Sequence, residues 1–187
     1  GATGDYSTAM GYETTASGTY STAMGAVTTA SGNASTAMGE STIASGTYST
    51  AMGVGTTASG TYSTAMGVGT TASGTYSTAM GDGTIASGVI STAMGGGTTA
   101  SDYGSLVIGQ FNSSGSSVTN SATAFNAANT AFVIGNGTDT GVDASDAFSI
   151  LFDGTTTIAG SVTATSFVGD GSGLTGITGS ASSLNDL

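Results

Sequence analysis

The chain has 187 residues, a length that suits one globular or one elongated domain, and it carries eleven acidic residues with no Lys, Arg or His. Without Lys, Arg and His, the chain cannot form side-chain ion pairs, use imidazole catalysis or bind phosphate through arginine. It also lacks Cys, which excludes thiol catalysis and, together with the lack of His, the usual zinc sites. A net charge of −11 makes nucleic acid and anionic membrane surfaces unfavourable partners.

No apolar run approaches the roughly 18 residues that a membrane span needs, so we expect no direct insertion of this segment into a membrane. The chain begins at Gly1 without the basic region of a signal peptide, and we expect a mature product or a fragment. The absence of Lys and Arg leaves trypsin-like proteases no cleavage site, which favours an extracellular location.

A 14-residue repeat dominates the first half of the chain. The pentapeptide Ser-Thr-Ala-Met-Gly begins at Ser7 and recurs at constant spacing up to Ser91, and a diverged copy spans Ser105–Gly109. A second motif, Thr-Thr/Ile-Ala-Ser-Gly, occupies the other half of each unit. Such a unit is too short for a helical hairpin but fits two short strands and two tight turns. The repeat therefore predicts a β-solenoid whose coils rise by about 4.8 Å.

Stacked coils place equivalent residues in columns. Residues two apart share a strand face, so Thr8 and Met10 point the same way. Leu106 and Ile108 take these two places in the diverged copy, so the sequence predicts that this face is buried. We interpret the methionines as flexible core fillers rather than metal ligands. The predicted core ladder is Met10, Met24, Met38, Met52, Met66, Met80, Met94 and Ile108.

A tyrosine column runs beside the turns, at Tyr6, Tyr20, Tyr48, Tyr62 and Tyr76. Ala34 and Ile90 fill the gaps in this column. Two interpretations stay open, a surface on which glycans stack and simple side-chain stacking beside the turn. The candidate surface-binding residues are Tyr20, Tyr48, Tyr62 and Tyr76.

The coil is narrow and rich in Ala, Ser, Thr and Gly, which bury too little apolar area to hold one chain in a single state. Repeats also bury their faces mainly against neighbours. We therefore expect chains to associate along the rod.

The composition changes after residue 109. Residues 110–125 are rich in Ser and Asn and predict a loop that leaves the roll. Phe148–Phe152 predicts a strand that the Asp153-Gly154 turn closes, a hairpin signal. From Thr155 the apolar residues alternate as in a thin, twisted strand, and the chain from Leu174 predicts the start of a helical stalk. We expect three regions: a roll over 1–109, a head-terminal β and loop region over 110–157, and a twisted β neck or stalk start over 158–187.

The alternating Ser-Thr-Ala-Met-Gly and Thr-Ala-Ser-Gly units resemble the YadA-like head repeat of trimeric autotransporter adhesins, from Gly1 to about Gly109. Phe132–Thr138, Ala147–Gly154 and Thr163–Leu174 resemble the segment after such heads in fibre proteins that end in an endosialidase-type intramolecular chaperone, as phage tail fibres do. The resemblance implies an all-β fold, in which left-handed parallel β-rolls form a parallel homotrimer and a thin intertwined β region follows. It implies no enzymatic activity in the head.

Carboxylates are the acidic groups available for chemistry. Asp139, Asp143 and Asp146 lie close together in the sequence, and their oxygens suit calcium, although the EF-hand pattern is missing. We therefore name these three as candidate metal ligands and expect no other cofactor. Glu40 and Asp82 lie three coils apart, about 14 Å, which is wider than a glycosidase pair.

The sequence favours a non-enzymatic, structural or adhesive trimeric fibre that attaches at a cell or virion surface, with a host surface, matrix or glycan as partner. A phage-type tail fibre or a free extracellular filament with a purely structural role remains an alternative. Ice binding is disfavoured because Thr15 pairs with Ser17, and because Ile43 and Ile85 interrupt the Thr15 column.

Overall fold

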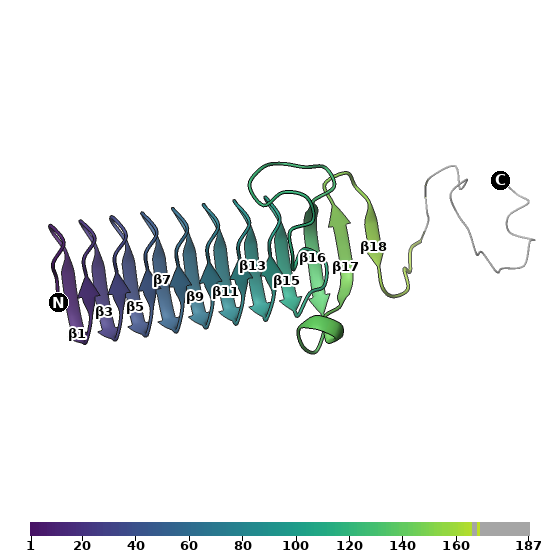
Figure 1. The fold of residues 1–187 in the computed structure, drawn as a ribbon. Helices are drawn as coiled ribbons and strands as arrows, with labels where there is room; N and C mark the ends of the chain where they lie inside the picture. The colour runs from purple at the N-terminus through teal and green to yellow at the C-terminus, as the bar shows by residue number, and fades with distance from the viewer. Residues whose placement is uncertain (166–167, 169–187) are drawn as a thin grey trace, which may run out of the picture.

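The computed structural model describes residues 1–165 and 168. The repeats wind into stacked coils, each with one long and one short strand (Figure 1). The long strands are β1 Thr8–Tyr12, β3 Thr22–Ala26, β5 Thr36–Glu40, β7 Thr50–Val54, β9 Thr64–Val68, β11 Thr78–Asp82, β13 Thr92–Gly96 and β15 Leu106–Gln110. The short strands are β2 Thr15–Ala16, β4 Thr29–Ala30, β6 Ile43–Ala44, β8 Thr57–Ala58, β10 Thr71–Ala72, β12 Ile85–Ala86 and β14 Thr99–Ala100.

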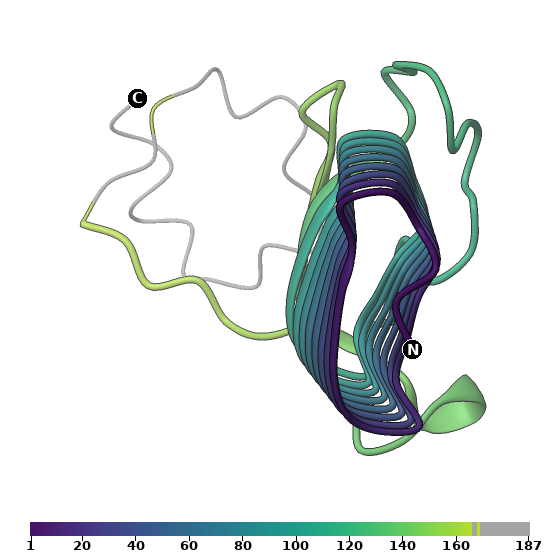
Figure 2. The same cartoon turned by 90° about the vertical axis from the view of Figure 1, so that its left-hand side faces the viewer.

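Neighbouring coils pair in parallel and in register with the repeat. Thr8 pairs with Thr22 and Met10 with Met24, and the same register continues coil after coil. Seen from the end, the coils superpose as one outline (Figure 2). The predicted parallel β-solenoid with 14-residue coils is therefore confirmed.

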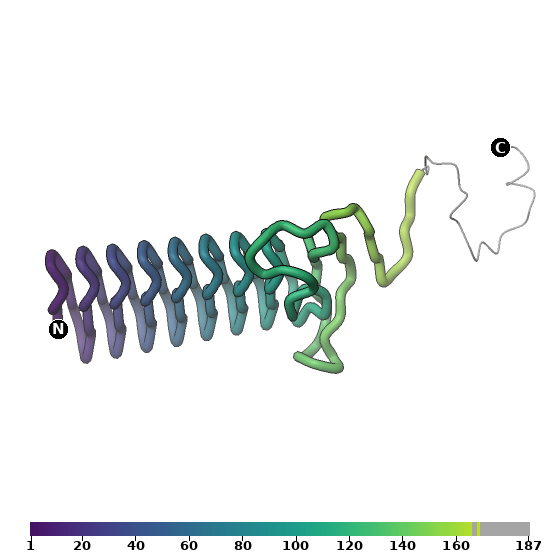
Figure 3. The backbone as a smooth tube through the Cα atoms, turned by 45° about the horizontal axis from the view of Figure 1, so that its top comes forward, coloured from purple at the N-terminus to yellow at the C-terminus, as the bar shows by residue number. Residues whose placement is uncertain are grey.

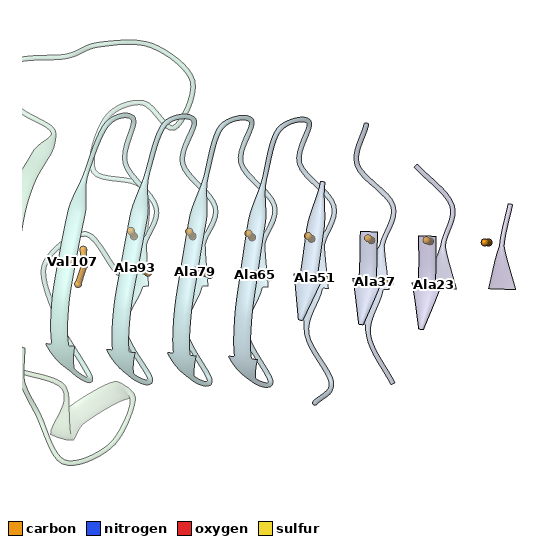
Figure 4. Packing of buried hydrophobic residues seen from close by; sticks show 14 of the residues in the cluster. Ala23, Ala37, Ala51, Ala65, Ala79, Ala93 and Val107 are labelled. Carbon is orange, nitrogen blue, oxygen red and sulfur yellow. The ribbon is translucent and has the colours of Figure 1, made fainter. Parts of the chain in front are cut away.

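Alanine forms the apolar core of the roll, next to buried Ser and Thr side chains (Figure 4). One column of fully buried alanines lies on the long strands and a second lies on the short strands, and Val107 and Val133 continue the first column. The buried alanines are Ala23, Ala37, Ala51, Ala65, Ala79 and Ala93 on the long strands, and Ala16, Ala30, Ala44, Ala58, Ala72, Ala86 and Ala100 on the short strands. The two sheets are thus close together, and the alanine methyl groups of both sheets occupy the space between them.

The core ladder predicted for the methionines is wrong within one chain. Thr8 and Met10 do share a strand face, but the buried alanines of the neighbouring positions occupy the interior, so this face is the outer one. Met10 is 57% exposed, and the later methionines and Ile108 are partly exposed. The physical reason is width, because an interior that holds two facing alanines has no room for a methionine.

Glycine allows the long strands of neighbouring coils to approach each other closely. Gly25 has a φ of +124°, and a Cβ there would overlap the carbonyl oxygen of Gly39 in the next coil. The last residue of each Ser-Thr-Ala-Met-Gly motif therefore has to be Gly for two reasons, its backbone conformation and the close approach of the neighbouring strand.

The long-strand sheet continues without a break beyond the repeats. Strand β16, Thr130–Asn136, pairs in parallel with β15. Strands β17, Asp146–Leu151, and β18, Thr156–Ile158, then add antiparallel partners, so the hairpin predicted at Asp153-Gly154 is confirmed. The finished sheet has eleven strands, and the short-strand sheet has seven, among the described residues.

Two connections leave the roll near its carboxyl-terminal end. The chain between β15 and β16 forms a long loop on the side of the last coils (Figure 3). The chain between β16 and β17 carries a short 3-10 helix, η1 Gly141–Asp143. Of the predicted neck, residues 158–165 and 168 are described, and the helical stalk predicted from Leu174 lies outside the described residues.

Candidate binding surfaces

The outer face of the long-strand sheet carries two columns that run its whole length. Pairing places Leu106 beside Thr92 and Phe132, and Ile108 beside Met94 and Ile134. The register then continues through β17 and β18, so that aligned residues share one face. We call this surface the Thr–Met face. It consists of Thr8, Met10 and their equivalents in each coil, with Leu106, Ile108, Phe132, Ile134, Phe148, Ile150 and Ile158.

The Thr–Met face becomes more apolar toward its carboxyl-terminal end. There the repeating Thr and Met give way to Leu, Ile and Phe, and the rings of Phe132 and Phe148 lie 5.9 Å apart. Ile134 is 36% exposed and Leu106 is 37% exposed. Neither column contains an ionisable residue.

The acids at the rim of this face are too far apart for paired catalysis. Glu40 and Asp82 end their strands at the same register position, and Val54 and Val68 lie between them. Three strand spacings amount to about 14 Å. Both carboxylates are exposed, as solvated groups at the edge of the sheet.

The tyrosines stack in a ladder along one row of turns. The ring centroids of Tyr48 and Tyr62 lie 4.9 Å apart, as do those of Tyr62 and Tyr76, and both pairs are nearly parallel. Tyr6 and Tyr20 form a separate pair at 5.2 Å. Each of these residues has a left-handed backbone, with φ between 56° and 59°. All five side chains are exposed, Tyr6 at the end of the column the most, so the ladder is accessible to solvent.

Two of the three candidate calcium ligands accept hydrogen bonds within the chain. The Asp146 carboxylate accepts the N–H groups of Ser113 and Ser114 and the Ser113 hydroxyl, at 2.8–2.9 Å. Asp139 accepts the N–H of Thr140. In the described part of the chain no three acidic residues gather as a metal-binding group, Asp143 included. Calcium binding at these residues stays a prediction.

Asp102 was not among the predicted site residues, yet it organises the end of the roll. Its carboxyl is fully buried and accepts the N–H of Thr119 at 2.7 Å and that of Thr130 at 2.8 Å. It stands where the earlier repeats have Gly, and this departure was the available signal. Asp102 thereby fixes the long loop and the first residue of β16 to the last coil.

A shallow depression of about 310 Å³ lies beside the last coil, where η1 approaches it. Gly97, Phe111, Asn112 and Thr140 are among its lining residues, and no carboxylate lines it. An adjoining hollow shares Gly97, Phe111 and Thr140 with it and is lined by Asp82 as well.

These features define a class of protein: a parallel β-solenoid repeat with an alanine core and, on its outer face, two long columns without charged residues. The family model of the YadA head domain repeat matches residues 2–27, 30–56, 58–84 and 86–112, more than half of the chain. The chain belongs to this family. A comparison with curated proteins gives no match.

Membership has direct consequences for the kind of protein this is. YadA heads are surface-exposed parts of adhesins and form homotrimers, so the chain is of a structural, adhesin-type family with an extracellular or cell-surface setting. Among the described residues, no helix has the length and hydropathy to cross a membrane.

Proposed function

We propose that three copies of this chain pack in parallel through their Thr–Met faces to form a non-enzymatic fibre that attaches to a host surface, matrix or glycan. The observation that carries this proposal is the apolar end of the Thr–Met face, which one chain leaves partly exposed. A phage-type tail fibre would use the same assembly, and it would differ in being attached to a virion instead of a cell surface.

Energetics support assembly through this face. Full burial of a Leu, Ile or Phe side chain contributes about 1.5–3 kcal/mol relative to full exposure. Seven such residues lie at the carboxyl-terminal end of the Thr–Met face, already partly buried, so about 1 kcal/mol from each remains for association. Chains with a charge of −11 can meet here because neither column carries a carboxylate.

A matched pair of substitutions tests the assembly. Ile134 on the Thr–Met face is 36% exposed, and Ile85 on the outer face of the short-strand sheet is 40% exposed. We expect Ile134→Asp to lower the mass in solution, because it would bring three carboxylates into one interface without a cation. Ile85→Asp should leave the mass at three chains.

Light scattering on the purified proteins measures both outcomes. Equal masses for the two variants, or a greater effect from Ile85→Asp, would show that the Thr–Met face is not the interface.

A further inference from the structure

One coil interrupts the tyrosine ladder without disturbing the backbone. Ala34 stands where the neighbouring coils have Tyr20 and Tyr48, and its φ of 50° is close to their 59° and 57°. The Ala34 N–H donates to the Thr19 carbonyl at 2.7 Å, and the Tyr48 N–H donates to the Asn33 carbonyl at 2.8 Å. The column therefore continues in register, and one ring is missing from it.

The space left by this ring has a fixed width. Two coil rises separate Tyr20 from Tyr48, which is about 9.6 Å. A ring seated midway would lie about 4.8 Å from each wall, within the range of stacked rings. The tyrosines of the ladder keep nearly the same spacing, 4.9 Å. We call this space the ring slot; its walls are Tyr20 and Tyr48, and Ala34 lies between them.

Each wall is supported from behind. Tyr6 stacks on the far side of Tyr20, with 8° between the ring planes. Tyr62 stacks on the far side of Tyr48, with 6° between the planes. The two walls are thus held parallel to the neighbouring rings, and the faces turned toward the slot are free to take a ligand.

A polar group accompanies the missing ring. Asn33 is exposed and replaces the Thr that stands at the equivalent position of the adjacent coils, Thr19 and Thr47. Its exposed amide offers both donors and an acceptor in the same turn as Ala34. This coil therefore differs from its neighbours in two ways: Ala34 leaves an open gap between tyrosine rings, and Asn33 adds hydrogen-bonding capacity next to it.

The chemistry of the slot selects an uncharged ring with polar edges. A chain with no Lys, Arg or His and a net charge of −11 disfavours sulfated or acidic sugars and phosphates. A pyranose ring presents C–H groups on its faces, which pack against tyrosine rings, and hydroxyl groups at its edge, which can pair with Asn33. An aromatic side chain of a protein would match the width but would leave the Asn33 amide without a role.

We infer that the ring slot binds one pyranose unit of a neutral polysaccharide between Tyr20 and Tyr48. This inference rests on the proposed attachment function and names its ligand class. One chain forms the whole slot, so the two proposals can fail separately. A trimer that binds no sugar contradicts the slot alone, and a monomer that binds sugar contradicts the assembly alone.

The test uses NMR titration of the assembled protein with cellohexaose, laminarihexaose and maltohexaose. At least one of these should bind the parent protein. Ala34→Tyr supplies the missing ring, so it should weaken that binding at least tenfold while the protein melts at or above the temperature of the parent. Asn33→Thr restores the repeat residue and leaves the slot open, so it should weaken binding by a smaller factor.

Ile90→Tyr is the matched control. Ile90 lies in the same column with a φ of 62°, so this variant adds a tyrosine to the ladder and leaves the ring slot unchanged. It should bind as the parent does. The inference is overturned if none of the three oligosaccharides binds at millimolar concentration, or if Ala34→Tyr binds as well as Ile90→Tyr. Tighter binding of trigalacturonic acid or of a tyrosine-containing peptide would overturn it too.

Discussion

Tyr62 illustrates how the repeat combines a strained backbone with side-chain stacking. Its φ of 58° lies in the left-handed region, which costs a residue other than glycine about 1–2 kcal/mol. Its ring stacks on Tyr48 below and Tyr76 above. Each stacked pair contributes about 0.5–1.5 kcal/mol, enough to offset the backbone cost.

Two substitutions at Tyr62 separate these contributions. Tyr62→Ala keeps the strained backbone and loses both stacked pairs, so we expect the free energy of unfolding to fall by about 1–3 kcal/mol per chain. Tyr62→Gly also relieves the strain but adds chain entropy to the unfolded state, so it should be less destabilising by about 0.5–1 kcal/mol. Chemical denaturation measures both. If Tyr62→Ala is as stable as the parent, stacking does not offset the strain.

At the scale of elements, Asp102 joins the last coil to the strands that follow it. Its buried carboxyl accepts two backbone N–H groups, from the long loop and from β16. Asp102→Ala would leave these donors unpaired, and hydrogen bonds to a charged group contribute about 1.5–3 kcal/mol. We expect faster hydrogen exchange at the Thr119 and Thr130 amides, and a loss of about 3 kcal/mol.

Asp82→Ala is the control for this prediction, because the Asp82 side chain is exposed at the rim of the sheet. It should leave exchange at Thr119 and Thr130 unchanged. If Asp102→Ala also leaves exchange at these two amides unchanged, the carboxyl does not hold β16 in place.

The repeat period and residue parity were enough to predict the coils, the two-strand unit and the shared face of Thr8 and Met10. Parity alone could not say which face is inside. Leu106 and Ile108 pointed to burial, yet the interior of most coils holds only the small side chains of Ala, Ser and Thr, and the larger apolar residues lie on the outer face. The ring slot was also beyond prediction, because it depends on Ala34 keeping the same backbone conformation as the tyrosines around it.

The whole molecule has no side-chain cation to balance its acids. Each chain carries −11, and a trimer carries three times that charge. Salt screens repulsion between exposed carboxylates over about 10 Å at 0.1 M and leaves the alanine core unaffected. We therefore expect the melting temperature to rise by a few degrees between low salt and about 0.3 M NaCl. Scanning calorimetry would contradict this expectation by showing a fall.

The stability of the β17–β18 turn is expected to depend on pH through Asp153. The N–H and hydroxyl of Thr155 lower the pKa of Asp153 below its ordinary value of 3.8. A lowered folded-state pKa contributes stability that is present above the unfolded-state pKa and is lost as the pH falls through the folded-state value. The β17–β18 turn should therefore keep this contribution from pH 7 down to about pH 4 and weaken below it. Amide exchange at Thr155 as a function of pH measures this.

Parallel assembly of three chains is the central claim, and spin-label distances test it most directly. The chain has no Cys, so Ser17→Cys and Ser73→Cys each provide one labelling site, both exposed and in the same column four coils apart. In a parallel trimer the three labels lie at one height, and the coils superpose along the rod (Figure 2). The two sites should therefore give the same single interchain distance. Different distances for the two sites, or no dipolar coupling between chains, would contradict the account.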